Sequence, residues 1–170
     1  MLTACQTSST KENPLLTEST LDYQAPDFSK IRPAHFVPAI EEGIRIQLAE
    51  IDSITSNTAA PTFENTVLAY EKSGRLLARA TSILSGLVGA DGTEELQKID
   101  EETTPMLSAH HDALLLNEKL FARVKAVYDQ RSSLKGEDLR LTEVLYDQFV
   151  HEGALLSAAD KEALKKINSE

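Results

Sequence analysis

The sequence predicts an all-α protein that folds as an antiparallel helical bundle. Leu, Ala, Glu and Lys are abundant, whereas aromatic residues make up 5% of the chain and Trp is absent. This balance favours helices over sheets. From Pro33 onward, apolar residues recur at spacings of three and four, and no segment of useful length alternates apolar and polar residues as a strand does. We therefore expect helices that pack on one another through apolar stripes.

Each predicted helix carries one such stripe. The first is formed by Val37, Ile40, Ile44, Leu48 and Ile51. The second begins near the segment PTFENT and is formed by Val67, Tyr70, Leu77, Leu84 and Leu87. The third is formed by Leu96, Ile99, Met106 and Leu114, the fourth by Leu120, Val124 and Val127, and the fifth by Leu141, Leu145 and Phe149. Apolar stripes with this period are typical of helices that bury one face.

Turn and capping residues predict where these helices begin and end. The segments GADG (89–92) and SSLKGED (132–138) are expected to be a turn and a loop. Pro105 either kinks the third helix or marks a new helix after Thr104. Ser157 and Asp160 have the spacing of a capping box, so a last helix is expected to begin at about Ala158.

Charge and cysteine content restrict the function. The 170 residues can bury a core of one domain, and no run of 18 apolar residues is long enough to span a bilayer. There are 27 acidic and 17 basic residues, a formal net charge of -10 that repels nucleic-acid phosphates. We therefore expect no nucleic-acid partner. Cys5 is the only cysteine, so no internal disulfide can form.

A His-Glu pair at His151 and Glu152 suggests the zinc-peptidase motif HExxH. That motif needs a second imidazole one helical turn later, and the residue at this position is Leu155. Gly153 instead fits the left-handed residue that follows a helix C-terminus, which places His151 and Glu152 in the last turn of the fifth predicted helix. The pair is therefore interpreted as a helix end and not as a metal site.

The other candidates for metal binding are His35 and the segment formed by His110, His111 and Asp112. Adjacent residues of a helix point about 100° apart, so this segment is poorly arranged around one ion. His110 falls on the apolar stripe, where we expect a buried, hydrogen-bonded imidazole. No phosphate loop, CxxC pair or GxSxG motif is present. The residues thus predict no catalytic, cofactor-binding or metal-binding site.

The start of the chain differs in composition from the rest. Residues 2–5, ending in Cys5, resemble a bacterial lipobox, which would make Cys5 a lipidation site, and a polar run rich in Ser and Thr follows. We expect residues 1–30 to be a flexible tether and residues 31–170 a helical domain. Either a leader was removed and the chain restarts at Met1, or the match is accidental. The first alternative predicts a lipoprotein on the periplasmic side of a bacterial membrane, and the second a cytoplasmic protein.

Four stretches together resemble a known family. They are IRPAHFVPAIEEGI (31–44), PTFENTVLAYEKSGRLLARA (61–80), LSAHHDALLLNEKLFARVKAVYDQR (107–131) and LTEVLYDQFVHEGALLSAADKEALKKIN (141–168). In this order they are similar to the N-terminal region of bacterial peptidyl-dipeptidases and of oligopeptidase A, in the thimet oligopeptidase family of zinc metallopeptidases. Members of this family are nearly all-helical, much longer than this chain, and enclose a deep channel for short peptides.

The resemblance implies that this chain is an N-terminal helical fragment of such an enzyme. The family's zinc ligands and its transition-state-stabilising residues lie far downstream, so no residue here inherits their roles, and the fragment alone should be metal-free and inactive. Its implied partners are oligopeptide substrates, reached through the full-length enzyme, and the missing catalytic domain. The chain ends in a freshly started helix, so we expect uncovered apolar surface, and hence a fragment that dimerises or is marginally stable. The alternative is a stand-alone helical interaction module tethered to a membrane.

Overall fold

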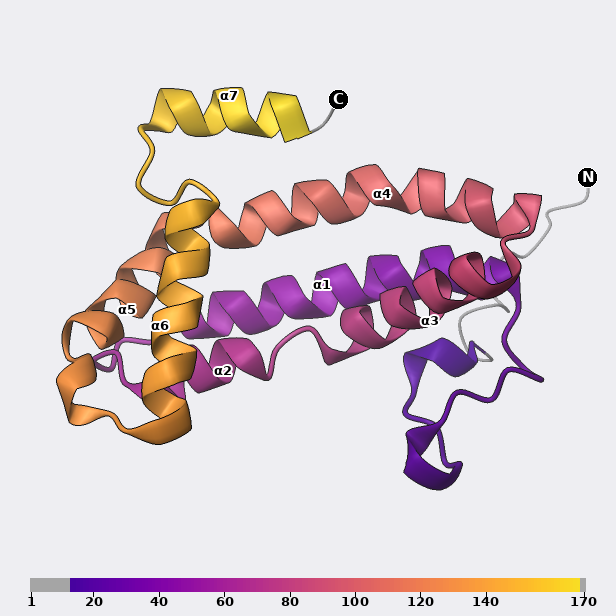
Figure 1. Cartoon of the computed structure of the whole chain (residues 1–170), viewed down its shortest axis with the longest axis horizontal. Coiled ribbons are helices and arrows are strands. Elements are labelled where there is room, and N and C mark those ends of the chain that lie inside the picture. Colours follow the sequence, from indigo (N-terminus) through magenta and orange to yellow (C-terminus); the bar gives the residue numbers. More distant parts are fainter. Residues whose placement is uncertain (1–12, 169–170) are drawn as a thin grey trace, which may run out of the picture. The chain divides into compact units, whose positions relative to one another are not determined.

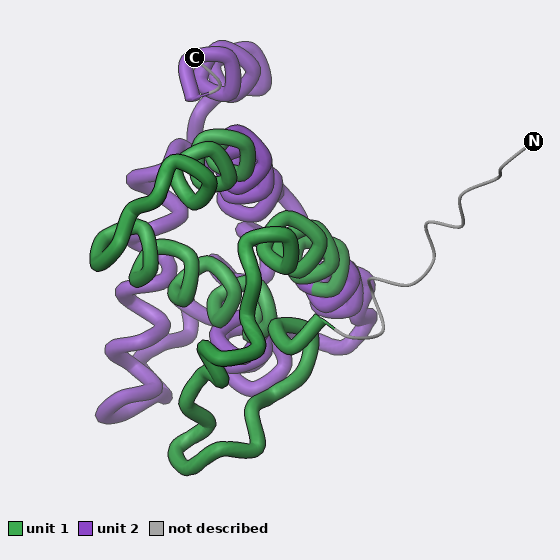
Figure 2. Tube along the Cα trace, turned by 90° about the vertical axis from the view of Figure 1, so that its right-hand side faces the viewer, with its two compact units in different colours: residues 1–46, 74–104 green, residues 47–73, 105–170 purple. Residues whose placement is uncertain are grey.

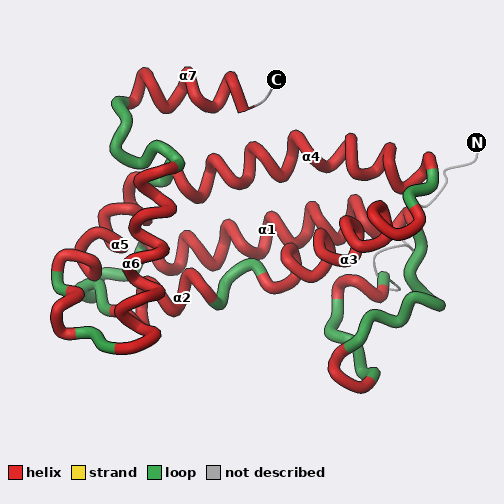
Figure 3. Tube along the Cα trace, viewed as in Figure 1, coloured by secondary structure: helices red, strands yellow, loops and turns green. Residues whose placement is uncertain are grey.

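A computed structural model describes residues 13–168, and helices are its only regular elements within that range (Figures 1 and 3). The prediction of an all-α protein is confirmed. The chain divides into two compact units, residues 1–46 with 74–104 and residues 47–73 with 105–170 (Figure 2). Two of the three boundaries fall inside long helices, α1 (Phe36–Thr55) and α4 (Glu94–Leu115), and the third falls between Ser73 and Gly74. No helix in the described part of the chain is both long and apolar enough to cross a membrane.

Unit 1 contains α3 (Arg75–Asp91) and the parts of α1 and α4 that lie within its bounds. Between residue 13 and α1 lie three short 3-10 turns, at Pro14–Leu16, Asp22–Gln24 and Pro33–His35. α1 and α3 approach closely at Gly43, where an added Cβ would lie 2.8 Å from the Cα of Leu77. A side chain at this position would force the two helices apart, so glycine is required for their packing.

The segment before α1 is partly packed on unit 1. Leu15 is 1% exposed, and its carbonyl accepts a 2.9 Å hydrogen bond from Nη2 of Arg79. The side-chain amide of Asn13 donates to the carbonyl of His35 at 2.8 Å. Both residues belong to the stretch expected to be a tether, and they make specific contacts. Residues 1–12, including the predicted lipidation site Cys5, lie outside the described residues, so the division at residue 30 stays a prediction.

Unit 2 contains the remaining parts of α1 and α4 together with six further helical elements in its described residues. These are a π-helical turn (Phe63–Val67), α2 (Leu68–Glu71), α5 (Glu118–Asp129), a 3-10 turn (Arg131–Ser133), α6 (Gly136–His151) and α7 (Ala158–Asn168). Its core is formed by the apolar faces of α1, α4, α5 and α6. Phe149 is 0% exposed, and its ring centroid lies 5.9 Å from those of Phe121 and Tyr70. The stripes predicted for α5 and α6 thus form the centre of this core.

The second predicted helix is interrupted. The apolar stripe continues from Val67 to Leu87, but α2 ends at Glu71 and α3 begins at Arg75. Between them Gly74 has a φ of 69°, in the left-handed region. A right-handed helix cannot pass through this conformation, so the chain breaks even though the stripe continues.

Three further boundaries differ from the expectation. α6 begins at Gly136, so residues 136–138 of the predicted loop SSLKGED are helical. α3 extends to Asp91, so only the end of the predicted turn GADG lies outside the helix. α4 runs through Pro105 without ending, so the alternative of a new helix after Thr104 is wrong. The lost backbone donor at Pro105 removes one hydrogen bond from a helix of 22 residues, which its other backbone bonds tolerate.

Candidate functional site

Three consecutive residues near the C-terminal end of α4 bind three different elements of unit 2. Nε2 of His110 lies 2.7 Å from Oε1 of Gln47 on α1, and Nε2 of His111 lies 3.3 Å from Oε2 of Glu152 at the end of α6. Oδ1 of Asp112 accepts a 2.8 Å hydrogen bond from Nδ2 of Asn168 on α7. The side chains diverge because successive residues of a helix point about 100° apart. The segment therefore joins helices and does not form one polar centre.

His110 is buried, with 6% of its surface exposed, as the sequence predicts. The Gln47 amide that faces it also donates to Oγ of Ser73 at 3.2 Å, so Gln47 presents its oxygen to the imidazole. Nε2 of His110 is then the protonated nitrogen, and Nδ1 has no hydrogen-bond partner among the described residues. Burial, followed by the charge of His111, lowers the pKa of His110 below its usual value. His110 is therefore held in its neutral form.

The His-Glu pair lies at the end of α6, as predicted. Nδ1 of His151 lies 2.7 Å from the carbonyl of Asp147, one turn earlier, where it satisfies a backbone acceptor of the last turn. Glu152 is the C-cap, and Gly153 follows with a φ of 96°. The predicted helix end at Gly153 is confirmed. Glu152 contacts His111 of α4 and not the adjacent His151. The local sequence did not predict this contact between α4 and the end of α6.

His35, the remaining histidine, has a local role in unit 1. Its Nδ1 accepts a 3.1 Å hydrogen bond from the backbone N–H of Arg32. This contact closes the 3-10 turn at Pro33–His35, immediately before α1. The interaction fixes the entry of the chain into α1 and uses a ring nitrogen that a metal ion would need.

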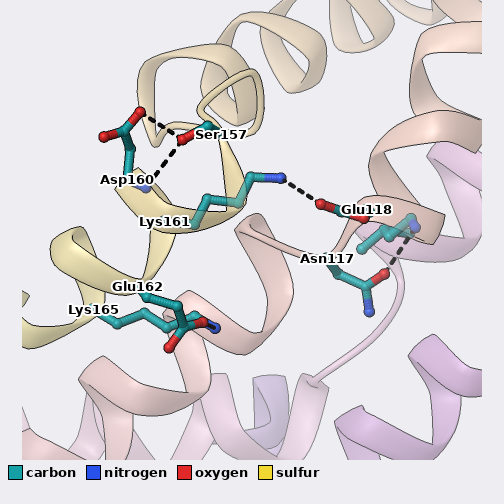
Figure 4. Close-up of polar contacts among 8 residues, drawn as sticks. Asn117, Glu118, Ser157, Asp160, Lys161, Glu162 and Lys165 are labelled. Carbon is teal, nitrogen blue, oxygen red and sulfur yellow. Dashed lines mark hydrogen bonds and ion pairs between the residues drawn. The ribbon is translucent and has the colours of Figure 1, made fainter.

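Polar contacts attach α7 to α4 and α5, and Figure 4 shows the contact with α5. The buried Lys161 places its Nζ 3.2 Å from Oε1 of Glu118, in the first turn of α5. Ser157 accepts a 3.2 Å bond from the backbone N–H of Asp160 and donates to its carboxylate at 2.7 Å. The predicted start of α7 is thus confirmed. The sequence did not predict the contacts of Lys161 and Asn168. The one feature that could have indicated them is that the two residues are seven apart and so lie on one face of the helix.

A pocket of about 230 Å³ lies between α4 and α7. Its lining consists of Pro105, Ser108, Ala109, Asp112 and Ala113 of α4 and Lys165 of α7. Most of these side chains are small, so they leave space between the two helices. No group of three or more His, Cys, Asp or Glu side chains within residues 13–168 is arranged to hold a metal ion. The contacts around α7 thus serve to position a helix.

Comparison with known proteins identifies the relatives of this chain. No protein-family model matches it. Over 160 residues, 93% of this chain, it is 46% identical to the dipeptidyl carboxypeptidase of Salmonella typhimurium, and over 163 residues, 95% of this chain, it is 44% identical to that of Escherichia coli. The chain is homologous to part of bacterial dipeptidyl carboxypeptidase. The match covers 24% of the length of each dipeptidyl carboxypeptidase, so the chain spans about a quarter of these relatives.

A weaker match extends the relationship. The chain is 29% identical over 117 residues to oligopeptidase A of Salmonella typhimurium, which covers 69% of this chain and 17% of the relative. The resemblance carried by the four sequence blocks is therefore confirmed. The identity to dipeptidyl carboxypeptidase covers nearly the whole chain, including α4, α5 and α6.

Proposed function

We propose that this chain is the N-terminal, non-catalytic helical part of a zinc metallopeptidase that releases dipeptides from the C-terminus of oligopeptides. One observation carries the proposal. The chain is 44–46% identical to dipeptidyl carboxypeptidases over nearly its whole length, yet covers only 24% of theirs. In this role the helices bound the channel through which short peptides reach a catalytic centre contributed by the rest of the polypeptide.

The residues of the candidate site support a structural role for this part. The one His-Glu pair has Leu155 where a second zinc ligand would have to lie. His110, His111 and Asp112 are each used to contact another helix. Zinc, when bound by the full-length enzyme, would supply the activated water that attacks the peptide bond, and its ligands would come from outside this chain. We therefore propose that the isolated chain is inactive.

The proposal is tested with a chimera of the Escherichia coli dipeptidyl carboxypeptidase in which this chain replaces the homologous 163 residues. Dipeptide release from a synthetic oligopeptide is followed by chromatography, with and without a metal chelator. The chimera should release dipeptides in a chelator-sensitive manner, and the isolated chain should release none even with added zinc.

Two results would contradict the proposal. One is chelator-sensitive release of dipeptides by the isolated chain. The other is a chimera that binds zinc and is folded by circular dichroism, yet is inactive towards all oligopeptides that the parent enzyme cleaves. Zinc content and circular dichroism of the chimera separate loss of function from failure to fold.

A further inference from the structure

α7 is attached to unit 2 almost without apolar packing. Isolated helices shorter than about 12–15 residues are marginal in water, so an 11-residue helix needs tertiary contacts. Lys161 is the only buried residue of α7, all of whose residues are described. Leu164 is half-buried, over Gly153. Lys161 and Asn168 make polar contacts with α5 and α4.

Large apolar side chains at both ends of α7 face solvent. Leu155 is 63% exposed and Leu156 41% exposed, in the turn that leads into the helix. Ile167, in the last turn, is 67% exposed. We call these three residues the α7 surface. Complete burial of an aliphatic side chain stabilises a protein by roughly 1.5–3 kcal/mol. The three exposed side chains contribute only a part of this stabilisation here.

The inner side of α7 gives an independent sign of incomplete packing. The pocket of about 230 Å³ between α4 and α7 is bordered by small side chains of α4. The hydrogen bonds of Asn168 with Ser108 and Asp112 therefore join α7 to α4 next to a space that no side chain fills. The helix is formed and capped, but Ile167 in its last turn remains largely exposed.

We propose that the α7 surface is the docking site for an apolar segment in the remainder of the homologous peptidase polypeptide. The inference rests on the proposed function, because about three quarters of the length of each relative lies outside the part matched here. A second copy of this chain fits less well. Three partly exposed aliphatic side chains cover far less than the roughly 800 Å² per partner of a stable interface. The formal charge of -10 on each copy also opposes self-association.

The experiment compares hydrogen exchange of α7 in the isolated chain and in the chimera described above. The α7 amides should exchange at least about tenfold more slowly in the chimera, where the rest of the polypeptide is present. The double variant Leu155→Gln/Ile167→Gln should restore fast exchange of α7 in the chimera and leave the isolated chain unchanged. Val144→Gln is the matched control, since Val144 is 44% exposed on α6 and lies outside the α7 surface.

Three results would overturn the inference. The first is equal exchange of α7 in the isolated chain and the chimera. The second is a double variant that behaves like Val144→Gln in the chimera. The third is a dimer of the isolated chain that the double variant abolishes, which would make a second copy the occupant. The two proposals fail separately: an active chimera with unprotected α7 refutes only the docking site, and an inactive chimera with protected α7 refutes only the proposed function.

Discussion

The core around Phe149 and the attachment of α7 lie in the same unit, but different forces stabilise them. In the core, Phe149, Leu120 and Val124 are 0% exposed, and aromatic rings pack on one another. At α7, the contacts are hydrogen bonds and an ion pair in which Glu118 is 76% exposed. Burial of each large apolar side chain contributes roughly 1.5–3 kcal/mol. The ion pair joins the buried Lys161 to an exposed carboxylate, whose charge is screened by water.

One unit thus contains a core stabilised by buried apolar side chains and a helix, α7, that is held mainly by polar contacts. The apolar side chains of the core are already covered by other residues of the same unit. α7 can open by itself, since few apolar contacts are lost when it does. We therefore expect mutations in the core to change global unfolding and mutations in α7 to change only local opening.

The largest effect is expected for Phe149→Ala. The substitution removes a ring that contacts Phe121 and Tyr70 and leaves a cavity in the core. Phe-to-Ala changes at such sites cost about 3–5 kcal/mol in free energy of unfolding. Urea denaturation followed by circular dichroism measures the loss. Val144→Ala, on the exposed face of the same helix, should change stability by less than about 0.5 kcal/mol. A similar small loss for Phe149→Ala would remove the distinction between core and surface.

Gly153→Ala tests the joint between the core and α7. Gly153 has a φ of 96°, and an added Cβ would lie 2.8 Å from Cδ1 of Leu156 and 3.1 Å from Cδ2 of Leu164. Backbone strain of this kind costs about 1–3 kcal/mol, and the two leucine side chains can shift to relieve the steric part. Thermal unfolding of the variant should show this loss.

The matched control is Gly86→Ala in α3, where nothing lies within 4 Å of the added Cβ. This change should stabilise the helix by about 0.5–1 kcal/mol, because alanine loses less backbone entropy. If both substitutions stabilise the protein, the left-handed glycine at the end of α6 has no structural role.

A third comparison uses two helix caps of the same kind. Oδ1 of Asn117 accepts from the backbone N–H of Leu120 at 3.0 Å at the start of α5, and Oγ of Ser157 does so for Asp160 at the start of α7. Removal of a cap costs typically about 1 kcal/mol. Asn117→Ala should lower global stability by that amount, because α5 belongs to the core. Ser157→Ala should speed hydrogen exchange in α7 and change global unfolding by less than about 0.5 kcal/mol. Equal global losses would show that α7 unfolds together with the core.

The features that the sequence predicted correctly depend on nearby residues. The stripe ending at Phe149, the left-handed Gly153 and the cap at Ser157 are local signals, each read within one or two helical turns. The break at Gly74 was missed because the apolar stripe continues across it, and hydrophobic period alone cannot detect a single left-handed residue.

The contacts of the candidate site required tertiary structure. Lys161 and Glu118 are 43 residues apart in the chain, and Asp112 and Asn168 are 56 apart. Helical spacing predicted that His110, His111 and Asp112 would diverge, but it could not supply their partners. Abundant Asp, Glu and Lys residues offer many equivalent pairings, and only the packing of the helices selects among them.

The smallest effect is expected from pH, through His110. Burial and the neighbouring His111 lower the pKa of His110 in the folded protein below its value of about 6.5 in the unfolded chain. Below about pH 6.5 the imidazole binds a proton more readily in the unfolded state than in the folded state. The contribution of His110 to the free energy of unfolding is therefore fully present above about pH 6.5 and decreases as the pH falls. His110→Gln removes this proton without changing His111 or His151.

The measurement is the free energy of unfolding of both proteins in urea between pH 7.5 and 5. The free energy of unfolding of the wild type minus that of His110→Gln should decrease as the pH falls, because only the wild type loses the stability associated with a neutral His110. Carboxylates with lowered pKa values, such as Glu42 beside Arg45, respond at lower pH and are common to both proteins. A difference that stays constant, or grows towards pH 5, would mean that the imidazole of His110 accepts a proton in the folded state.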